Sequence, residues 1–157
     1  MGPAILIIDD AESYKNKLKL MFEHEGHRVH TSSSVDKAVS LVNGLVRDNK
    51  LPELIILELR LSGTFGLSAL RAVQGALAGN RVPIVIASWG FDKLAQSHMA
   101  IMGAMGYVEK PVLLTTLYSF AVTVMKEHKV RLNQEQSIES DFLADLDLIP
   151  KTPSSAA

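Results

Sequence analysis

The sequence predicts an α/β protein in three layers, with a parallel five-stranded sheet between two layers of helices. Short apolar runs rich in β-branched residues alternate five times with longer segments of helical periodicity. The strand-like runs are mostly apolar throughout, which is typical of parallel strands covered on both faces. The chain has 157 residues, 47% of them hydrophobic, which is enough for one domain with a substantial core.

The alternation defines ten elements. The expected strands are residues 4–8, 28–31, 54–57, 84–87 and 107–109. The expected helices are residues 12–25, 34–47, 67–78, 92–102 and 112–129. Parallel strands joined by right-handed crossovers carry helices on both faces, a doubly wound (βα)5 arrangement. For five strands the flavodoxin-like order 2-1-3-4-5 is the leading candidate.

Local signals justify the elements of the first half. Residues 4–8 are apolar and are followed by two acids, as expected for a buried strand. Apolar side chains at helical spacing predict the next helix, and Gly26 ends it. Ser34 suits the N-cap of the second helix. Pro52 introduces the third strand, which runs into Glu58.

Similar signals mark the second half. Gly66 belongs to the loop before the third helix, and Pro83 opens the fourth strand. Asp92 suits the N-cap of the fourth helix. Gly103 turns the chain towards the fifth strand, and Pro111 follows it before the last long helix.

Composition excludes several functional classes. The net charge of −1 argues against a surface that binds polyanions over the whole protein, and we expect no nucleic-acid partner. The absence of cysteine excludes a disulfide scaffold, an iron–sulfur cluster and a thiolate zinc site. It also fits a reducing compartment, so we expect a cytoplasmic location. No apolar stretch approaches the roughly 20 residues of a membrane helix.

The last part of the chain differs in charge, so we divide it into a domain over residues 1–130 and an acidic tail over residues 131–157. Residues 133–157 hold one lysine and five acids, net −4, which leaves +3 on residues 1–132. Four apolar residues at helical spacing predict an amphipathic helix over residues 136–149: Ile138, Phe142, Leu146 and Ile149. The small, polar residues from 150 onwards predict a disordered end. With so short a tail, we expect output through docking rather than through an effector domain.

Polar side chains follow the strands at one edge of the predicted sheet. In the order 2-1-3-4-5, the first and third strands end beside each other, which brings Asp9, Asp10 and Glu58 into one acid crevice. Three close carboxylates need a cation or must raise a pKa, and Mg²⁺ prefers such oxygen ligands. The fourth strand ends at Ser88 and the fifth at Lys110. Hydroxyl, ammonium, metal and carboxylate together are suited to holding a transferring phosphoryl group.

The order and spacing of these residues resemble the receiver domain of bacterial two-component response regulators, the chemotaxis-regulator (CheY-like) fold. The resemblance covers residues 4 to about 129. It places the acid pair on the metal-binding acids of the family and Ser88 on its phosphoryl-binding Ser/Thr. It places Lys110, before a proline, on the invariant lysine and Tyr107 on the switch aromatic. The resemblance therefore implies phosphorelay signal transduction, with a kinase or a downstream effector as partner.

Three residues depart from the family pattern. Glu58 falls where the family has its phosphoacceptor aspartate, and its carboxylate sits over an ångström further out. A displacement of about 1 Å can cost roughly 10²-fold in such a transfer. Trp89 follows Ser88, where the family has a small residue; it would narrow donor access, and its N–H could bind a carboxylate. Ser62 stands where the family often has proline, and we expect it to alter only the local loop.

These departures favour a pseudo-receiver, a non-enzymatic interaction module that does not use the phosphorylation cycle. One alternative is a competent receiver that accepts phosphate on Glu58 or a neighbouring acid. Another is a flavodoxin-like nucleotide or flavin binder, which lacks a glycine-rich phosphate loop after the first strand.

Several side-chain roles stay open at this stage. The crevice either binds Mg²⁺ or is neutralised by a side chain. Arg60 either enters the crevice or lies in solvent, and Lys110 either contacts a phosphoryl group or pairs with Glu58 or Asp9. Tyr107 is either a switch or a static, half-buried ring.

The last helix suggests where a partner binds. It carries two apolar stripes, one of which, including Leu113 and Leu117, should face the sheet. The second comprises Leu114, Tyr118, Val122 and Met125. An exposed second stripe predicts an interaction surface, unless neighbouring helices half-cover it. The resemblance implies the same region, the face of the fourth helix, fifth strand and fifth helix. A homodimer or the acidic tail could cover it, and no membrane contact is expected.

Overall fold

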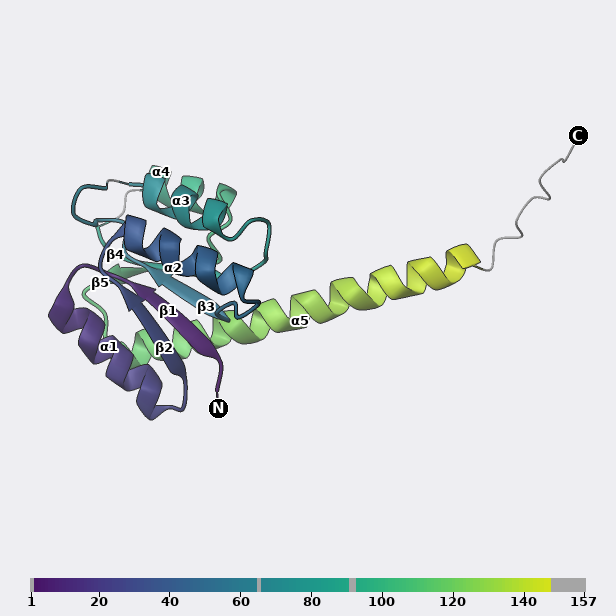
Figure 1. Ribbon diagram of the computed structural model, residues 1–157, viewed down its shortest axis with the longest axis horizontal. Helices are drawn as coiled ribbons and strands as arrows, with labels where there is room; N and C mark the ends of the chain where they lie inside the picture. Colours follow the sequence, from purple (N-terminus) through teal and green to yellow (C-terminus); the bar gives the residue numbers. More distant parts are fainter. Residues whose placement is uncertain (1, 65, 91–92, 148–157) are drawn as a thin grey trace, which may run out of the picture. The chain divides into compact units, whose positions relative to one another are not determined.

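The computed structural model describes residues 2–64, 66–90 and 93–147. The chain divides into two compact units, residues 1–125 and residues 126–157. The first unit contains a sheet of five parallel strands in the order β2-β1-β3-β4-β5 (Figure 1). The predicted fold class and strand order are therefore confirmed.

The elements alternate along the chain as expected. The strands are β1 (Ala4–Ile8), β2 (Arg28–Ser32), β3 (Leu54–Leu57), β4 (Ile84–Trp89) and β5 (Gly106–Lys110). The helices are α1 (Glu12–His24), α2 (Val35–Arg47), α3 (Ser68–Ala76), α4 (Lys93–Ile101) and α5 (Leu114–Asp147). Ser34 caps α2 by accepting a hydrogen bond from the backbone N–H of Lys37 at 3.2 Å. Asp92, the expected cap of α4, lies outside the described residues.

Each face of the sheet has its own apolar core, because every residue of β1 and β3 is buried and successive side chains point to opposite faces. One core joins the sheet to α2 and α3 through residues such as Leu6, Val42 and Leu70. The other joins it to α1 and to the first part of α5 through Ile7 and Leu117. Figure 1 shows α2, α3 and α4 on one side of the sheet and α1 on the other. The structure thus has the expected three layers.

The expected end of the last helix at Lys129 is wrong, because α5 continues to Asp147. A separate helix was predicted over residues 136–149. In the structure, residues 136–147 form the C-terminal part of α5. The physical reason is the absence of any glycine or proline between Pro111 and Pro150, so nothing in the sequence stops the helix. Ile149 and residues 150–157, the predicted disordered end, lie outside the described residues.

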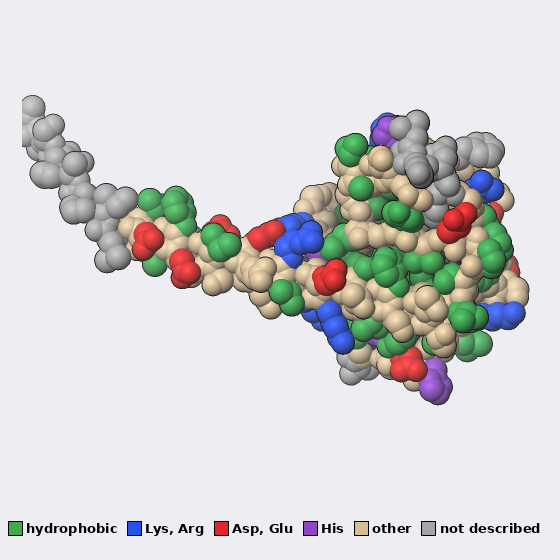
Figure 2. Space-filling model, turned by 180° about the vertical axis from the view of Figure 1, so that it is seen from behind, with side chains coloured by type: hydrophobic (Ala, Val, Ile, Leu, Met, Phe, Trp, Pro, Cys, Tyr) green, Lys and Arg blue, Asp and Glu red, His purple; other side chains and the backbone are tan. Residues whose placement is uncertain are grey.

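Beyond residue 126, α5 exposes apolar side chains along most of its length. Ile138 and Phe142 are 69% and 60% exposed, and Leu143 and Leu146 are also exposed. Figure 2 shows hydrophobic and acidic side chains beside one another on the described C-terminal part of the helix. The described residues of the predicted apolar stripe of the tail, Ile138, Phe142 and Leu146, are therefore exposed.

The predicted exposure of the second stripe on α5 is wrong. Met125 is buried, and Leu114, Tyr118 and Val122 are half-buried. The ring of Tyr118 packs edge-on against Phe22 of α1, with centroids 5.2 Å apart, and against His27 at 5.7 Å. The stripe is thus covered by the neighbouring helix and the segment after it.

The first stripe also differs in detail. Leu117 is buried against the sheet as expected, but Leu113 precedes the helix and is 73% exposed.

Substitution of Phe22 tests the packing of the core between α1 and α5. Phe22→Ala should lower the free energy of unfolding by about 3–5 kcal/mol, because the ring is fully buried and leaves a cavity. Leu20→Ala, on the same helix at 65% exposure, should change it by less than about 0.5 kcal/mol. Urea denaturation followed by circular dichroism measures both, and equal effects would contradict this packing.

Candidate functional site

The register of the sheet brings the acid crevice together. Ile8 of β1 lies opposite Leu57 of β3, so the residues that follow, Asp9 and Glu58, are neighbours at the carboxyl edge. The backbone N–H of Glu58 donates to the carbonyl of Ile8 at 2.9 Å, which continues the ladder beyond the strands. Both carboxylates are buried, at 4% and 3% exposure. Burying two carboxylates side by side requires a compensating cation.

Lys110, the last residue of β5, supplies that cation. Its Nζ lies 2.6 Å from Oδ2 of Asp9 and 2.9 Å from Oε2 of Glu58, and its side chain is 1% exposed. Nζ also lies 4.2 Å from the centre of the Tyr14 ring, a cation–π distance. Burial by itself would lower the pKa of Lys110, but the hydrogen bonds to Asp9 and Glu58 outweigh it and the pKa is raised. The ammonium group is therefore held in its charged form.

The remaining oxygen atoms of the two buried carboxylates also have donors. Oε1 of Glu58 accepts from the hydroxyl of Ser88 and, at 2.9 Å, from the backbone N–H of Arg60. Oδ1 of Asp9 accepts from the backbone N–H of Ala11 at 2.9 Å. Every oxygen of both carboxylates thus has a hydrogen-bond or ion-pair partner. Such saturation is what makes two buried charges tolerable.

Asp10 is held by a residue whose role the sequence did not reveal. Its Oδ2 accepts from the backbone N–H of Ser62 at 2.9 Å and from the Ser62 hydroxyl at 2.7 Å. The hydroxyl is the main cause that lowers the pKa of Asp10, and it outweighs the effect of burial. The expectation that Ser62 alters only its own loop is therefore wrong. Proline could supply neither donor, and that difference was the available signal.

The side chain of Arg60 does not enter the crevice. Arg60 is exposed, and its guanidinium lies beside Gly90, where a Cβ atom would come within 3.1 Å of Nη2. Of the two roles left open for Arg60, exposure to solvent is the one observed. Of the two roles left open for Lys110, pairing with both Asp9 and Glu58 is the one observed.

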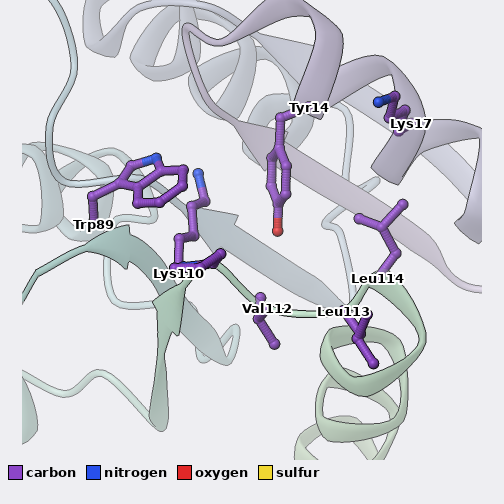
Figure 3. A pocket seen from close by; sticks show the side chains of 8 residues that line it. Tyr14, Lys17, Trp89, Lys110, Val112, Leu113 and Leu114 are labelled. Carbon is purple, nitrogen blue, oxygen red and sulfur yellow. The ribbon is translucent and has the colours of Figure 1, made fainter.

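Trp89 lies beside Lys110 on the outer side of the crevice and is 48% exposed (Figure 3). The expected hydrogen bond from its indole N–H to a carboxylate is not formed among the described residues. The indole instead lines a pocket next to the crevice, together with Tyr14 and Lys110. Trp89 thus lies beside the site as predicted, and no carboxylate among the described residues accepts from its indole.

Tyr107 is 44% exposed on β5, and its hydroxyl donates to Oε1 of Gln96 in α4 at 2.9 Å. This contact links the edge strand to the neighbouring helix. The side chain is exposed rather than half-buried, and both the static and the switching role stay predictions.

The sequence predicted that the acids of the crevice bind Mg²⁺, and this stays a prediction. Across residues 2–64, 66–90 and 93–147, no three His, Asp or Glu side chains come together in a way that could hold a metal ion. Lys110 lies between two of the three carboxylates expected to bind Mg²⁺, and Ser62 occupies an oxygen of the third. The Lys110 ammonium contributes one positive charge to the crevice.

Comparison with known proteins decides the family. Residues 5–121 match the family model described as the response regulator receiver domain. The chain belongs to this family. This receiver is 28% identical over 110 residues to the transcriptional regulatory protein AfsQ1 of Streptomyces coelicolor, covering 70% of this chain and 45% of that protein. It is 26% identical to the phosphate regulon transcriptional regulatory protein PhoB of Rhizobium meliloti, covering 82% of this chain and 55% of that protein.

Solved structures agree on the fold of the receiver. A CheY-like receiver domain from Methanospirillum hungatei superposes with a TM-score of 0.73 at 18% identity, covering 83% of this chain and 99% of that one. The HemR receiver domain from Leptospira biflexa superposes with a TM-score of 0.68 at 22% identity, covering 79% of this chain and 94% of that one. Thus the chain matches whole receiver domains but spans only about half the length of AfsQ1 and PhoB. Within the described residues, no helix has the length and hydropathy needed to span a membrane.

Removing Lys110 tests the ion pairs of the crevice. Lys110→Met should lower the free energy of unfolding by about 3–5 kcal/mol, because it leaves the buried carboxylates of Asp9 and Glu58 uncompensated. Lys17→Met, on the exposed side of α1, is the matched control and should change stability by less than about 0.5 kcal/mol. Urea denaturation at neutral pH measures both. A loss below about 1 kcal/mol for Lys110→Met would show that the pairs contribute little.

The hydrogen bonds from Ser62 to Asp10 should make the stability of the fold depend on pH in the acidic range. The pKa of Asp10 is lowered in the folded state, so its stabilisation is present above the ordinary value of 3.8 and is lost as the pH falls through the folded pKa. Ser62→Ala removes the hydroxyl donor and should be less stable than the wild type at neutral pH. The difference in free energy of unfolding between the two proteins should narrow below pH 3.8 as Asp10 is protonated. Urea titrations over this range measure this difference, and a difference independent of pH would contradict the assignment.

Proposed function

We propose that this chain is a pseudo-receiver, a cytoplasmic interaction module that signals without accepting a phosphoryl group on Glu58. The supporting observation is the saturation of the Glu58 carboxylate. Oε1 accepts from Ser88 and Arg60, and Oε2 accepts from Lys110, in a residue that is 3% exposed. An oxygen that attacks phosphorus must first give up such contacts. The additional methylene of glutamate also displaces the carboxylate from the position of an aspartate, at a cost of roughly 10²-fold per ångström.

The same proposal assigns Lys110 the role of an internal counter-ion. Its ammonium lies against Asp9 and Glu58, where a divalent cation would otherwise balance their charge. The resulting state of the site is fixed by the chain's own residues. In this proposal the module is not an enzyme, and the protein partner recognises a constant conformation.

A second candidate function has one observation in its favour. Ser88 and Lys110 both contact Glu58, so the hydroxyl and ammonium that could hold phosphoryl oxygens are already gathered at one carboxylate. A phosphorylation-competent receiver that uses Glu58 is therefore the alternative that the experiment has to separate.

For the partner we propose the face formed by α4, β5 and α5. Ile101 on α4 is 81% exposed and Tyr107 on β5 is 44% exposed. Ile101 and Tyr107 offer exposed apolar surface on this face, whereas the predicted stripe on α5 is covered. The partner is a kinase, a downstream effector or a second copy of the chain, and light scattering of the full chain identifies the last case. The acidic tail argues against nucleic acid.

Phosphoryl transfer is tested by intact-mass analysis after incubation with phosphoramidate or acetyl phosphate and Mg²⁺. We expect no stoichiometric phosphoryl adduct on the wild-type chain. Glu58→Asp is the matched variant, because it shortens the carboxylate by one methylene and leaves the charge unchanged. It should gain an adduct if side-chain length is the obstacle. A stoichiometric adduct on Glu58 of the wild type would refute the pseudo-receiver and support the alternative.

A further inference from the structure

A pocket of about 340 Å³ lies next to the acid crevice. Figure 3 shows its residues coming from α1, from the end of β4 and from the segment that joins β5 to α5. Most of the lining is apolar: the rings of Tyr14 and Trp89 and the side chains of Val112, Leu113 and Leu114. The network of hydrogen bonds and ion pairs in the crevice makes no use of these walls.

We propose that this pocket binds a small planar aromatic anion. The volume lies near the lower end of the range of roughly 300–1,000 Å³ that is usual for small-molecule sites. Two aromatic side chains line it, which suits a flat ring system. The proposal concerns binding alone, so it stands whether or not Glu58 accepts a phosphoryl group.

The apolar walls are exposed to an unusual degree. Leu113 is 73% exposed and Trp89 is 48% exposed, although both are large hydrophobic residues. A ligand that covers them removes apolar surface from water, which is favourable at roughly 25 cal/mol per Å². An aromatic ligand in the pocket would therefore gain by covering the indole of Trp89.

The polar groups of the pocket indicate the charge of the ligand. Lys110 is already paired with both Asp9 and Glu58, so it forms part of the wall and is not available as a cation for a ligand. Lys17 lines the pocket from α1, is exposed, and has no ion-pair partner among the described residues. An anionic group on the ligand would meet this ammonium.

The hydroxyl of Tyr14 is a second polar group available to a ligand. It is buried and has no hydrogen-bond partner in the part of the chain that the structure describes. Figure 3 shows it pointing towards the segment that carries Val112. Burial raises the pKa of Tyr14, so the hydroxyl keeps its proton and can donate. Leaving a buried donor unpaired is costly, so this hydroxyl would gain from a ligand oxygen that reaches it.

The chain offers a direct readout of binding, because Trp89 is its only tryptophan. The probe is 1-anilinonaphthalene-8-sulfonate, whose aromatic rings carry one sulfonate. Its uncharged counterpart, N-phenyl-1-naphthylamine, has the same rings without the anion. With the full-length chain, we expect saturable one-to-one binding of the sulfonate, with energy transfer from Trp89 to the probe.

Three variants separate the contributions to binding. Lys17→Ala should weaken binding of the sulfonate by about two- to fivefold, the size of one exposed charge contact, and leave the uncharged probe unaffected. Leu113→Glu places a carboxylate on the rim of the pocket, at a residue that is 73% exposed. It should weaken binding of the sulfonate probe by about tenfold or more. Lys37 is an exposed lysine on α2, across the sheet from the pocket. Lys37→Ala should leave binding of both probes unchanged.

Circular dichroism and urea denaturation establish that each variant is folded, which separates pocket binding from binding of the probe to loosened protein. Absence of saturable binding to the folded wild type would overturn the proposal. Binding that is unchanged in both Lys17→Ala and Leu113→Glu would also overturn it. So would a pocket that rejects both probes but binds a peptide carrying an aromatic side chain, since the occupant would then be a protein.

Discussion

The arrangement of the carboxyl edge of the sheet depends on the ammonium group of Lys110, whose single positive charge offsets part of the charge of two buried carboxylates. It contacts Asp9, which follows β1, and Glu58, which follows β3, from its own place at the end of β5. The three residues are far apart in sequence and meet only because the strands are parallel and end at one edge. Without this cation, two carboxylates would be buried side by side with nothing to compensate them.

The crevice is set by side-chain length as much as by charge. A glutamate at position 58 reaches Ser88 and Lys110 at the same time, and its Oε1 also accepts the backbone N–H of Arg60. Asp10 is fixed separately by both donors of Ser62. Each acid of the crevice therefore has partners from within the chain, and this self-sufficiency is the physical basis for proposing a receiver of constant state.

Trp89 and Lys110 connect this crevice to the neighbouring pocket. The ammonium faces two carboxylates and the ring of Tyr14, while the same lysine and the indole line the apolar cavity. A ligand in the pocket would touch groups that also order the crevice. A small molecule could thus bias the same edge of the sheet that phosphorylation controls in a competent receiver, through differential binding to its conformations.

The sequence alone determined the elements, their order in the sheet and the residues at its carboxyl edge. It could do so because apolar runs, turn residues and crossover handedness are local or topological signals. The tertiary structure decided which groups pair. Lys110 rather than Arg60 pairs with Glu58, Ser62 binds Asp10, and Phe22 and His27 pack against Tyr118. These outcomes depend on side-chain reach and on burial between elements distant in sequence, which no local pattern encodes.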